Sequence, residues 1–111
     1  MTKKKHSYSQ QTLHALTLFG EHIRYARKIR HMTASELAER LGVSRSTVQE
    51  IEKGKEQVAI GTYFEASTLL GIELFQHEHL SISAQRDYLQ NKVALLPKRT
   101  HQIKIEVKDD F

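Results

Sequence analysis

The chain of 111 residues contains no cysteine, no tryptophan and a single proline, and its longest hydrophobic runs are short. Without cysteine it can form neither disulfides nor thiolate zinc sites, and it has no cysteine nucleophile. A membrane-spanning helix needs about 18 consecutive apolar residues, which the sequence lacks. The N-terminal segment has a basic start with no apolar stretch behind it. We therefore expect a cytoplasmic protein that does not interact with membranes.

Signatures of enzyme chemistry are missing as well. The sequence has no glycine-rich phosphate loop, no nucleophile elbow and no kinase motif. Its seven histidines invite a metal-site interpretation, and His77, Glu78 and His79 form the nearest cluster. Residues two apart on a helix point in different directions, and no third ligand follows either histidine by four residues. We expect no catalytic residues, no bound metal and no cofactor, and hence no enzyme.

The composition is that of a globular protein with a basic surplus. Hydrophobic residues make up 39% and charged residues 27%, which is enough for a folded core. Seventeen Lys and Arg against thirteen Asp and Glu give a net charge of +4, which favours polyanionic partners. The surplus concentrates in Lys3–Lys5 and in the run 24–31. Each run is either a solvated surface or part of a binding site.

Local signals predict three helices in the first half of the chain. Apolar residues recur at steps of three and four over 12–31, although Gly20 lowers the local helix propensity there. Thr33 and Glu36 form a capping-box pattern at the start of a helix over 34–41. That helix ends at Gly42, because glycine readily takes the positive φ of a helix C-terminus.

The third predicted helix follows at once. Ser44 is a favourable N-cap for the segment 45–53, and Gly54 closes it. The two short helices therefore cross at a tight turn. The positions where such helices must touch are small or apolar: Leu37, Ala38, Leu41, Gly42, Val43, Val48 and Ile51. This spacing predicts a helix-turn-helix.

The outer side of the third helix carries residue types that recognise base edges. At about 100° per residue, a polar arc of roughly 140° faces away from Val48 and Ile51. Arg can bind guanine, Gln can bind adenine, Glu can accept from cytosine, and Ser suits several partners. An ordinary polar helix surface is the alternative interpretation. The arc consists of Arg45, Ser46, Gln49, Glu50 and Lys53.

These residues belong to a longer resemblance. The segment 32–72, "MTASELAERLGVSRSTVQEIEKGKEQVAIGTYFEASTLLGI", is similar to the helix-turn-helix of the phage repressor and Cro superfamily, also called the XRE family. The likeness covers about residues 15–75 and implies a lambda repressor-like, all-α fold. It also implies a structural salt bridge between Arg27 and Glu52, a dimer, and binding of a two-fold DNA operator.

The same resemblance assigns roles on DNA. It implies base contacts by Arg45, Ser46 and Glu50, with Gln49 adjacent. It implies phosphate contacts by Ser44 and Thr47, with Lys53 and Lys55 close enough to help. The family often has glutamine where this chain has Ala34, so we expect Thr33 or Ser35 to replace that phosphate contact.

A narrower likeness concerns the segments "VAIGTYFEASTLLGIE" and "ALLPKR". They resemble HipB-type antitoxins, which bind DNA and pair with HipA-like kinase toxins. This likeness implies an antitoxin that represses its own operon and binds a kinase-like toxin. The alternatives are a stand-alone XRE-type repressor and an interaction module that keeps the fold without binding DNA.

The second half of the chain completes a predicted fold of five or six helices with one strand. Helices are expected over 61–71 and 81–95, with a short one around 73–80. After Pro97, β-branched residues alternate with charged ones, which predicts a strand that pairs between subunits. The strand residues assigned to dimerisation are Ile103, Ile105 and Val107. The expected domains are a flexible basic arm, a DNA-binding domain and a dimerisation tail: 1–11, 12–96 and 97–111.

Overall fold

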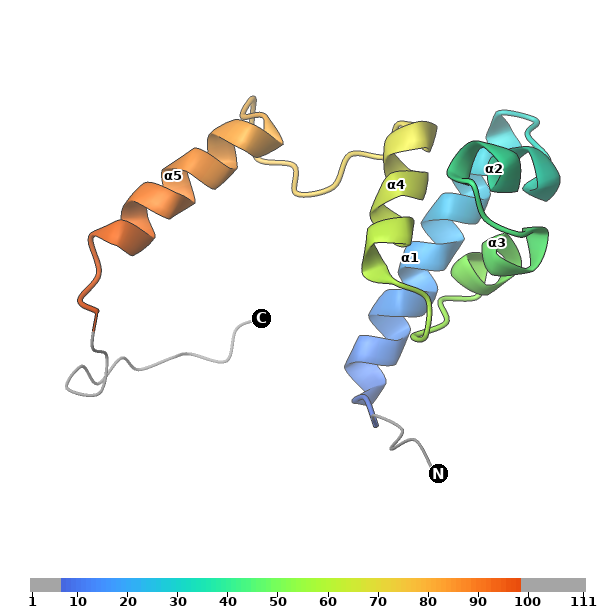
Figure 1. Cartoon of the computed structure of the whole chain (residues 1–111), viewed down its shortest axis with the longest axis horizontal. Coiled ribbons are helices and arrows are strands. Elements are labelled where there is room, and N and C mark those ends of the chain that lie inside the picture. The colour runs from blue at the N-terminus through green and yellow to red at the C-terminus, as the bar shows by residue number, and fades with distance from the viewer. Residues whose placement is uncertain (1–6, 99–111) are drawn as a thin grey trace. The chain divides into compact units, whose positions relative to one another are not determined.

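The computed structural model describes residues 7–98, and the regular secondary structure in that range is all helical, with no strand in it. The five helices of this range are α1 (Gln10–Ile29), α2 (Ala34–Leu41), α3 (Arg45–Glu52), α4 (Ile60–Leu70) and α5 (Ile82–Ala94) (Figure 1). The chain divides after Leu74 into two compact units, and α5 belongs to the second. This division falls inside the range 12–96 that the sequence pattern assigns to one domain.

Short-range hydrogen bonds fix the ends of α2 and α3. The Thr33 hydroxyl accepts from the Glu36 amide and the Glu36 carboxylate accepts from the Thr33 amide, both at 3.0 Å. Gly42 ends α2 with a φ of 71°. The Ser44 hydroxyl accepts from the Thr47 amide at 3.1 Å and begins α3. Because these signals act over three or four residues, the predicted start and end of α2 and start of α3 agree with the structure.

The core of the first unit forms where all four of its helices meet. α1 contacts α3 and α4, and α2 also contacts both. Leu41 and Val43 pack at the edge of the core as half-buried residues. The fully or almost fully buried apolar residues are Ile23, Ala26, Leu37, Ala38, Val48, Ile51, Tyr63, Ala66 and Leu70. The contact positions predicted for the helix-turn-helix are thus part of one core with α1 and α4, except Gly42, which is exposed in the turn.

Two glycines let α1 lie against the end of α3. A Cβ atom on Gly20 would be 2.5 Å from the Ile51 carbonyl oxygen and 2.7 Å from that of Glu52. Gly54 has a φ of 74°, and a Cβ there would be 2.5 Å from the Leu16 carbonyl oxygen. Such distances are far inside van der Waals contact. Gly20 is therefore required by packing, although from sequence it is only a weak helix former.

The short helix expected around 73–80 is not formed, so the count of six helices is wrong for the described range. Phe75 and Glu78 have φ values of 57° and 50°, in the left-handed region. A residue with positive φ cannot continue a right-handed α-helix. The following helix is present as α5, with the Ser81 hydroxyl accepting from the Ala84 amide at 3.1 Å. The strand expected over 103–107 and the lysines of the N-terminal arm lie outside the described residues.

Candidate nucleic-acid interface

The inner and outer sides of α3 differ sharply in burial. Val48 and Ile51 have no exposed surface. Arg45, Ser46 and Gln49 are exposed on the other side. The helix therefore presents a polar surface to the outside while its apolar residues hold it on the core. Of the remaining residues of the predicted arc, Lys53 is exposed and Glu50 is half-buried.

Hydroxyl groups cluster at the N-terminus of α3. The Ser44 Oγ lies 2.9 Å from both the Ser46 Oγ and the Thr47 Oγ1. Ser44 and Ser46 are exposed, and Thr47 is half-buried. The side chains that the sequence assigned to phosphate or base contacts are thus brought together at one end of the helix. Hydroxyls and helix N-terminal amides are both suitable donors to a phosphate.

The N-terminus of α2 differs from that of α3 because a carboxylate lies beside its hydroxyl groups. Thr33 and Ser35 are both exposed there. A hydrogen bond from the Thr33 backbone amide to the Glu36 carboxylate, and a second one from the Thr33 side chain, lower the pKa of Glu36. A carboxylate that stays ionised beside Thr33 repels an approaching phosphate. Ser35 is the better placed of the two predicted contacts.

A two-point ion pair joins α1 to the end of α3. The Arg27 Nε and Nη2 donate to the Glu52 carboxylate at 2.6 Å and 2.9 Å, and the Nη1 donates to the Met32 carbonyl at 2.8 Å. The two side chains are only 11% and 9% exposed. The hydrogen bond to Glu52 raises the pKa of Arg27, outweighing the burial that lowers it. The Arg27–Glu52 pair that the family resemblance implied is therefore present in the structure. It holds the end of α3 against α1 and so helps to orient the exposed side of α3.

Tyr63 holds the segment that follows α3. Its hydroxyl donates to the Lys55 carbonyl at 2.7 Å, and its ring lies 5.2 Å from that of Phe19. Burial, with the carboxylates of Glu50 and Glu56 nearby, raises the pKa of Tyr63 to about 12. Tyr63 lies in the segment 61–71, where the sequence pattern predicts a helix but indicates no partner for its hydroxyl. The structure adds a hydrogen bond that fixes the backbone of Lys55, a residue assigned to phosphate contact.

A groove of about 880 Å³ runs beside the outer side of α3 and is lined partly by α1. Thr33, Arg45, Gln49 and Lys53 line it, and the Arg27–Glu52 pair forms part of its wall. The basic α1 residues that line it belong to the run 24–31, for which the sequence left open a solvated surface or part of a binding site, and their steps of four and three place them on one helix side. These basic residues are Arg24, Lys28 and His31.

Residues 7–98 contain no group of three or more His, Cys, Asp or Glu side chains arranged to hold a metal ion. None of the five helices there is both long enough and apolar enough to cross a membrane.

A tight turn between two short helices, the second with a buried apolar side and an exposed polar side, defines a helix-turn-helix protein. Comparisons with known proteins agree with this class. Residues 23–76 match the family model described as Helix-turn-helix. Over 52 residues the chain is 35% identical to a relative from Methanocaldococcus jannaschii named as an uncharacterised HTH-type transcriptional regulator. That match spans 47% of this chain and 79% of the relative. No solved structure matches the chain. The chain belongs to the XRE-type helix-turn-helix family.

Proposed function

We propose that the protein is a transcription regulator that binds double-stranded DNA by placing α3 in the major groove. The observation that carries this proposal is the two-sided burial of α3, with Val48 and Ile51 covered and Arg45 and Gln49 exposed. A major groove about 12 Å wide admits one helix. The outer side of α3 is then the surface that meets base edges.

The side chains on this surface have complementary chemistry for reading DNA. Arg45 can donate two hydrogen bonds to guanine O6 and N7, and Gln49 can pair with adenine. Ser46 and the half-buried Glu50 complete the base-contact set that the family resemblance implied. Ser44 and Thr47 are placed at the helix N-terminus, where they would donate to a backbone phosphate.

Phosphate attraction by the helices α1 to α4 depends on where charges lie, because residues 7–74 have no formal net charge. Residues 7–74 contain eight Lys and Arg and eight Asp and Glu. Arg24 and Lys28 lie on the groove beside α3, together with Lys53. Phosphate contacts supply much of the affinity of a DNA-binding protein, whereas base contacts supply specificity. We infer that Arg24 and Lys28 of α1 and Lys53 at the end of α3 supply phosphate contacts along this groove, and that Lys55 supplies a further contact beyond it.

A dimer would match the symmetry of an operator. Two copies of α3 would enter major grooves about 34 Å apart, which is one helical turn of DNA. The sequence assigns dimerisation to Ile103, Ile105 and Val107, and this stays a prediction. It implies that deleting residues 100–111 weakens the dimer more than it changes the helical core. An unchanged dimer in light scattering after that deletion would exclude the intermolecular strand.

A more specific candidate is an antitoxin of the HipB type, acting in the cytoplasm. It is favoured by the likeness of residues 58–73 and 94–99 to such antitoxins. In this role the protein would repress its own operon and bind a HipA-like kinase toxin. Co-expression with the product of the neighbouring gene, followed by affinity pull-down, tests the role. A stable complex with a toxic neighbour supports it, and no complex leaves a stand-alone repressor.

The DNA-binding proposal itself is tested with a fluorescent duplex from upstream of the protein's own gene, measured by anisotropy over a range of salt concentrations. We expect tight binding that weakens steeply as salt rises, because each neutralised phosphate releases counterions. A scrambled duplex should bind more weakly by about 10³-fold or more. Absence of binding to either duplex at low salt would contradict the proposal and favour an interaction module that does not bind DNA.

A further inference from the structure

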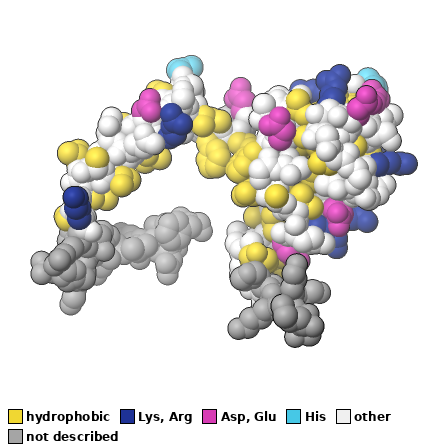
Figure 2. Space-filling view, viewed as in Figure 1, with side chains coloured by type: hydrophobic (Ala, Val, Ile, Leu, Met, Phe, Trp, Pro, Cys, Tyr) yellow, Lys and Arg dark blue, Asp and Glu magenta, His cyan; other side chains and the backbone are white. Residues whose placement is uncertain are grey.

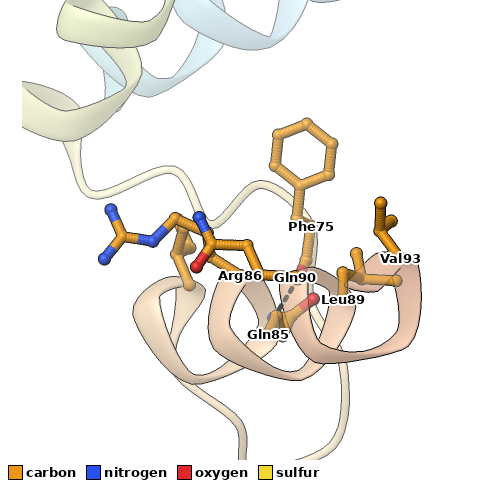
Figure 3. A pocket seen from close by; sticks show the side chains of 7 residues that line it. Phe75, Gln85, Arg86, Leu89, Gln90 and Val93 are labelled. Atoms are coloured by element: carbon orange, nitrogen blue, oxygen red, sulfur yellow. Dashed lines mark hydrogen bonds between the residues drawn. The ribbon is translucent and has the colours of Figure 1, made fainter. Parts of the chain in front are cut away.

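The groove beside α3 has an excess of positive charge. On the face of the helices α1 to α4 that Figure 2 shows, Lys and Arg side chains lie among Asp and Glu side chains. The groove itself is lined by five Lys and Arg side chains and only two Glu side chains, and Glu52 is already paired with Arg27. The groove on α5 is mainly apolar by contrast, as Phe75, Leu89 and Val93 show in Figure 3. The groove beside α3 is therefore the one that suits an anion.

One residue on this groove has an unusual backbone conformation. His31 lines the groove directly after α1 and has a φ of 54°. The chain takes the same left-handed turn after α2, α3 and α4, at Gly42, Gly54 and Gly71, with φ values of 71°, 74° and 70°. Among the four helices of residues 7–74, α1 is thus the one that ends with a side chain at this position.

Hydrogen bonds fix the backbone around His31. Its amide donates to the Lys28 carbonyl at 3.0 Å, and the next amide, that of Met32, donates to the Arg27 carbonyl at 3.2 Å. The Arg27 guanidinium in turn donates to the Met32 carbonyl at 2.8 Å. Glycine would make this turn at lower conformational cost, because a β-carbon crowds the backbone at positive φ. The position therefore gives up some backbone stability and gains an exposed side chain.

The imidazole supplies a donor that this part of the groove otherwise lacks. The neighbouring lining residues Met32 and Ala34 have apolar side chains. The Thr33 hydroxyl belongs to the capping box and lies beside the Glu36 carboxylate. An anion that lies against the connection between α1 and α2 in this groove therefore finds its side-chain donor in His31.

The charges around His31 determine what would protonate it. Histidine changes charge near neutral pH, and a phosphate beside it favours the protonated form. The charged groups that face this groove are Glu21, Arg24, Arg27 and Lys28 from α1, Arg45 and Glu52 from α3, and Lys53 after α3, with Glu36 of α2 beside Thr33. Because Lys and Arg outnumber Glu in this set, a bound phosphate is the charge that would favour an imidazolium there.

We propose that His31 binds a backbone phosphate of the DNA and takes up a proton from solvent when the DNA binds. This inference rests on the proposed function and deepens it, because it adds a contact and makes the affinity depend on pH. A backbone phosphate is the expected anion, since a helix that enters the major groove brings its flanking residues to the phosphates on either side.

DNA affinity as a function of pH tests the proposal. With the fluorescent upstream duplex at constant ionic strength, wild type should bind more tightly at pH 6 than at pH 8. His31→Gly should lose about fivefold of this gain, because the variant has no imidazole to take up the proton. His22→Gln removes an exposed histidine of α1 that does not line the groove, and it should keep the whole gain. A His31→Gly variant with the affinity and pH profile of wild type would overturn the proposal.

Two further measurements separate a phosphate contact from a structural role. At pH 6 the slope of log Kd against log salt should be shallower by about 0.9 in His31→Gly, because one neutralised phosphate is lost. The same variant should unfold at a temperature equal to or above that of wild type, because glycine relieves the left-handed turn. His31→Asn tolerates positive φ but does not titrate, so it should have the pH profile of His31→Gly. An unchanged salt slope, or a His31→Asn variant with the wild-type pH profile, would contradict the phosphate contact.

Failure of this inference and failure of the proposed function give different results. A wild-type protein that binds neither duplex at low salt removes the proposed function and the role of His31 with it. Salt-dependent binding by wild type that is the same in His31→Gly at every pH leaves DNA binding intact and removes only the His31 contact.

Discussion

Arg27 on α1 donates hydrogen bonds to both carboxylate oxygens of Glu52 at the end of α3. Its third nitrogen donates to the Met32 carbonyl just before α2. One guanidinium therefore ties together three segments of the helix-turn-helix unit. Glu52 is followed directly by Lys53, and Gln49 lies one turn earlier on α3. The orientation of the polar surface of α3 thus depends on an ion pair whose two side chains are largely buried.

Glu52→Gln tests this scaffold. The substitution leaves a largely buried guanidinium without its counter-charge, and we expect a loss of about 3 kcal/mol in the free energy of unfolding. Urea denaturation followed by circular dichroism measures it. Glu65→Gln is the matched control, because Glu65 is exposed on α4 and should matter little. Equal stabilities of the two variants would show that the buried pair adds nothing to the fold.

Gly20→Ala separates packing from helix propensity. In an open helix this change would stabilise by up to about 1 kcal/mol. At Gly20 the added Cβ would meet the Ile51 carbonyl oxygen at 2.5 Å, so we expect destabilisation by about 1 to 3 kcal/mol. Gly61→Ala, on α4 with nothing within 4 Å of its Cβ, should be neutral or stabilising. Thermal unfolding of both variants gives the comparison, and a stabilised Gly20→Ala would mean that α1 and α3 are further apart.

Arg45→Ala and Lys28→Ala should weaken DNA binding in different ways. Removing the base contact of Arg45 should cost about 1 to 3 kcal/mol on the specific duplex and reduce discrimination against altered bases, with the fold intact. Removing Lys28 should weaken binding to all sequences similarly and reduce the salt slope by about 1. Arg40→Ala, which removes a charge outside the groove, is the control. Specific binding by Arg45→Ala equal to wild type would show that α3 does not read bases through this residue.

Tyr63 should make stability fall at high pH. Its folded-state pKa of about 12 lies above the ordinary value of 10.0, so the folded protein keeps a proton that the unfolded chain has released. The resulting stabilisation is complete below about pH 10 and is lost between pH 10 and 12. Urea unfolding of wild type and Tyr63→Phe should therefore differ less as pH rises through this range. Tyr88→Phe removes an exposed tyrosine and serves as the control. A constant difference between wild type and Tyr63→Phe from pH 8 to 11.5 would contradict the prediction.

Sequence reasoning succeeded where the controlling interactions are local. The Thr33–Glu36 capping box, the Gly42 turn and the Ser44 cap each act within four residues, and the structure has all three. It failed at the short helix around 73–80, where the backbone of Phe75 and Glu78 takes positive φ without a glycine to signal it.

Contacts between distant segments were beyond local patterns. Nothing near Gly20 in the chain shows that the carbonyl of Ile51 lies against it, and nothing near Tyr63 shows that its hydroxyl reaches Lys55. The groove beside α3 likewise needed α1 to be placed before Arg24 and Lys28 could be assigned to it.

The amino-acid sequence alone determined where α2 and α3 begin and which side of α3 is apolar, because caps, glycine and helical periodicity operate over one or two turns. Only the tertiary structure decided which distant groups share a surface. It places the arginines of α1 beside Arg45 and Gln49, which are predicted to contact bases, and the carbonyls of α3 against a glycine of α1. Close packing sets those positions, and it depends on the shapes of all the helices at once.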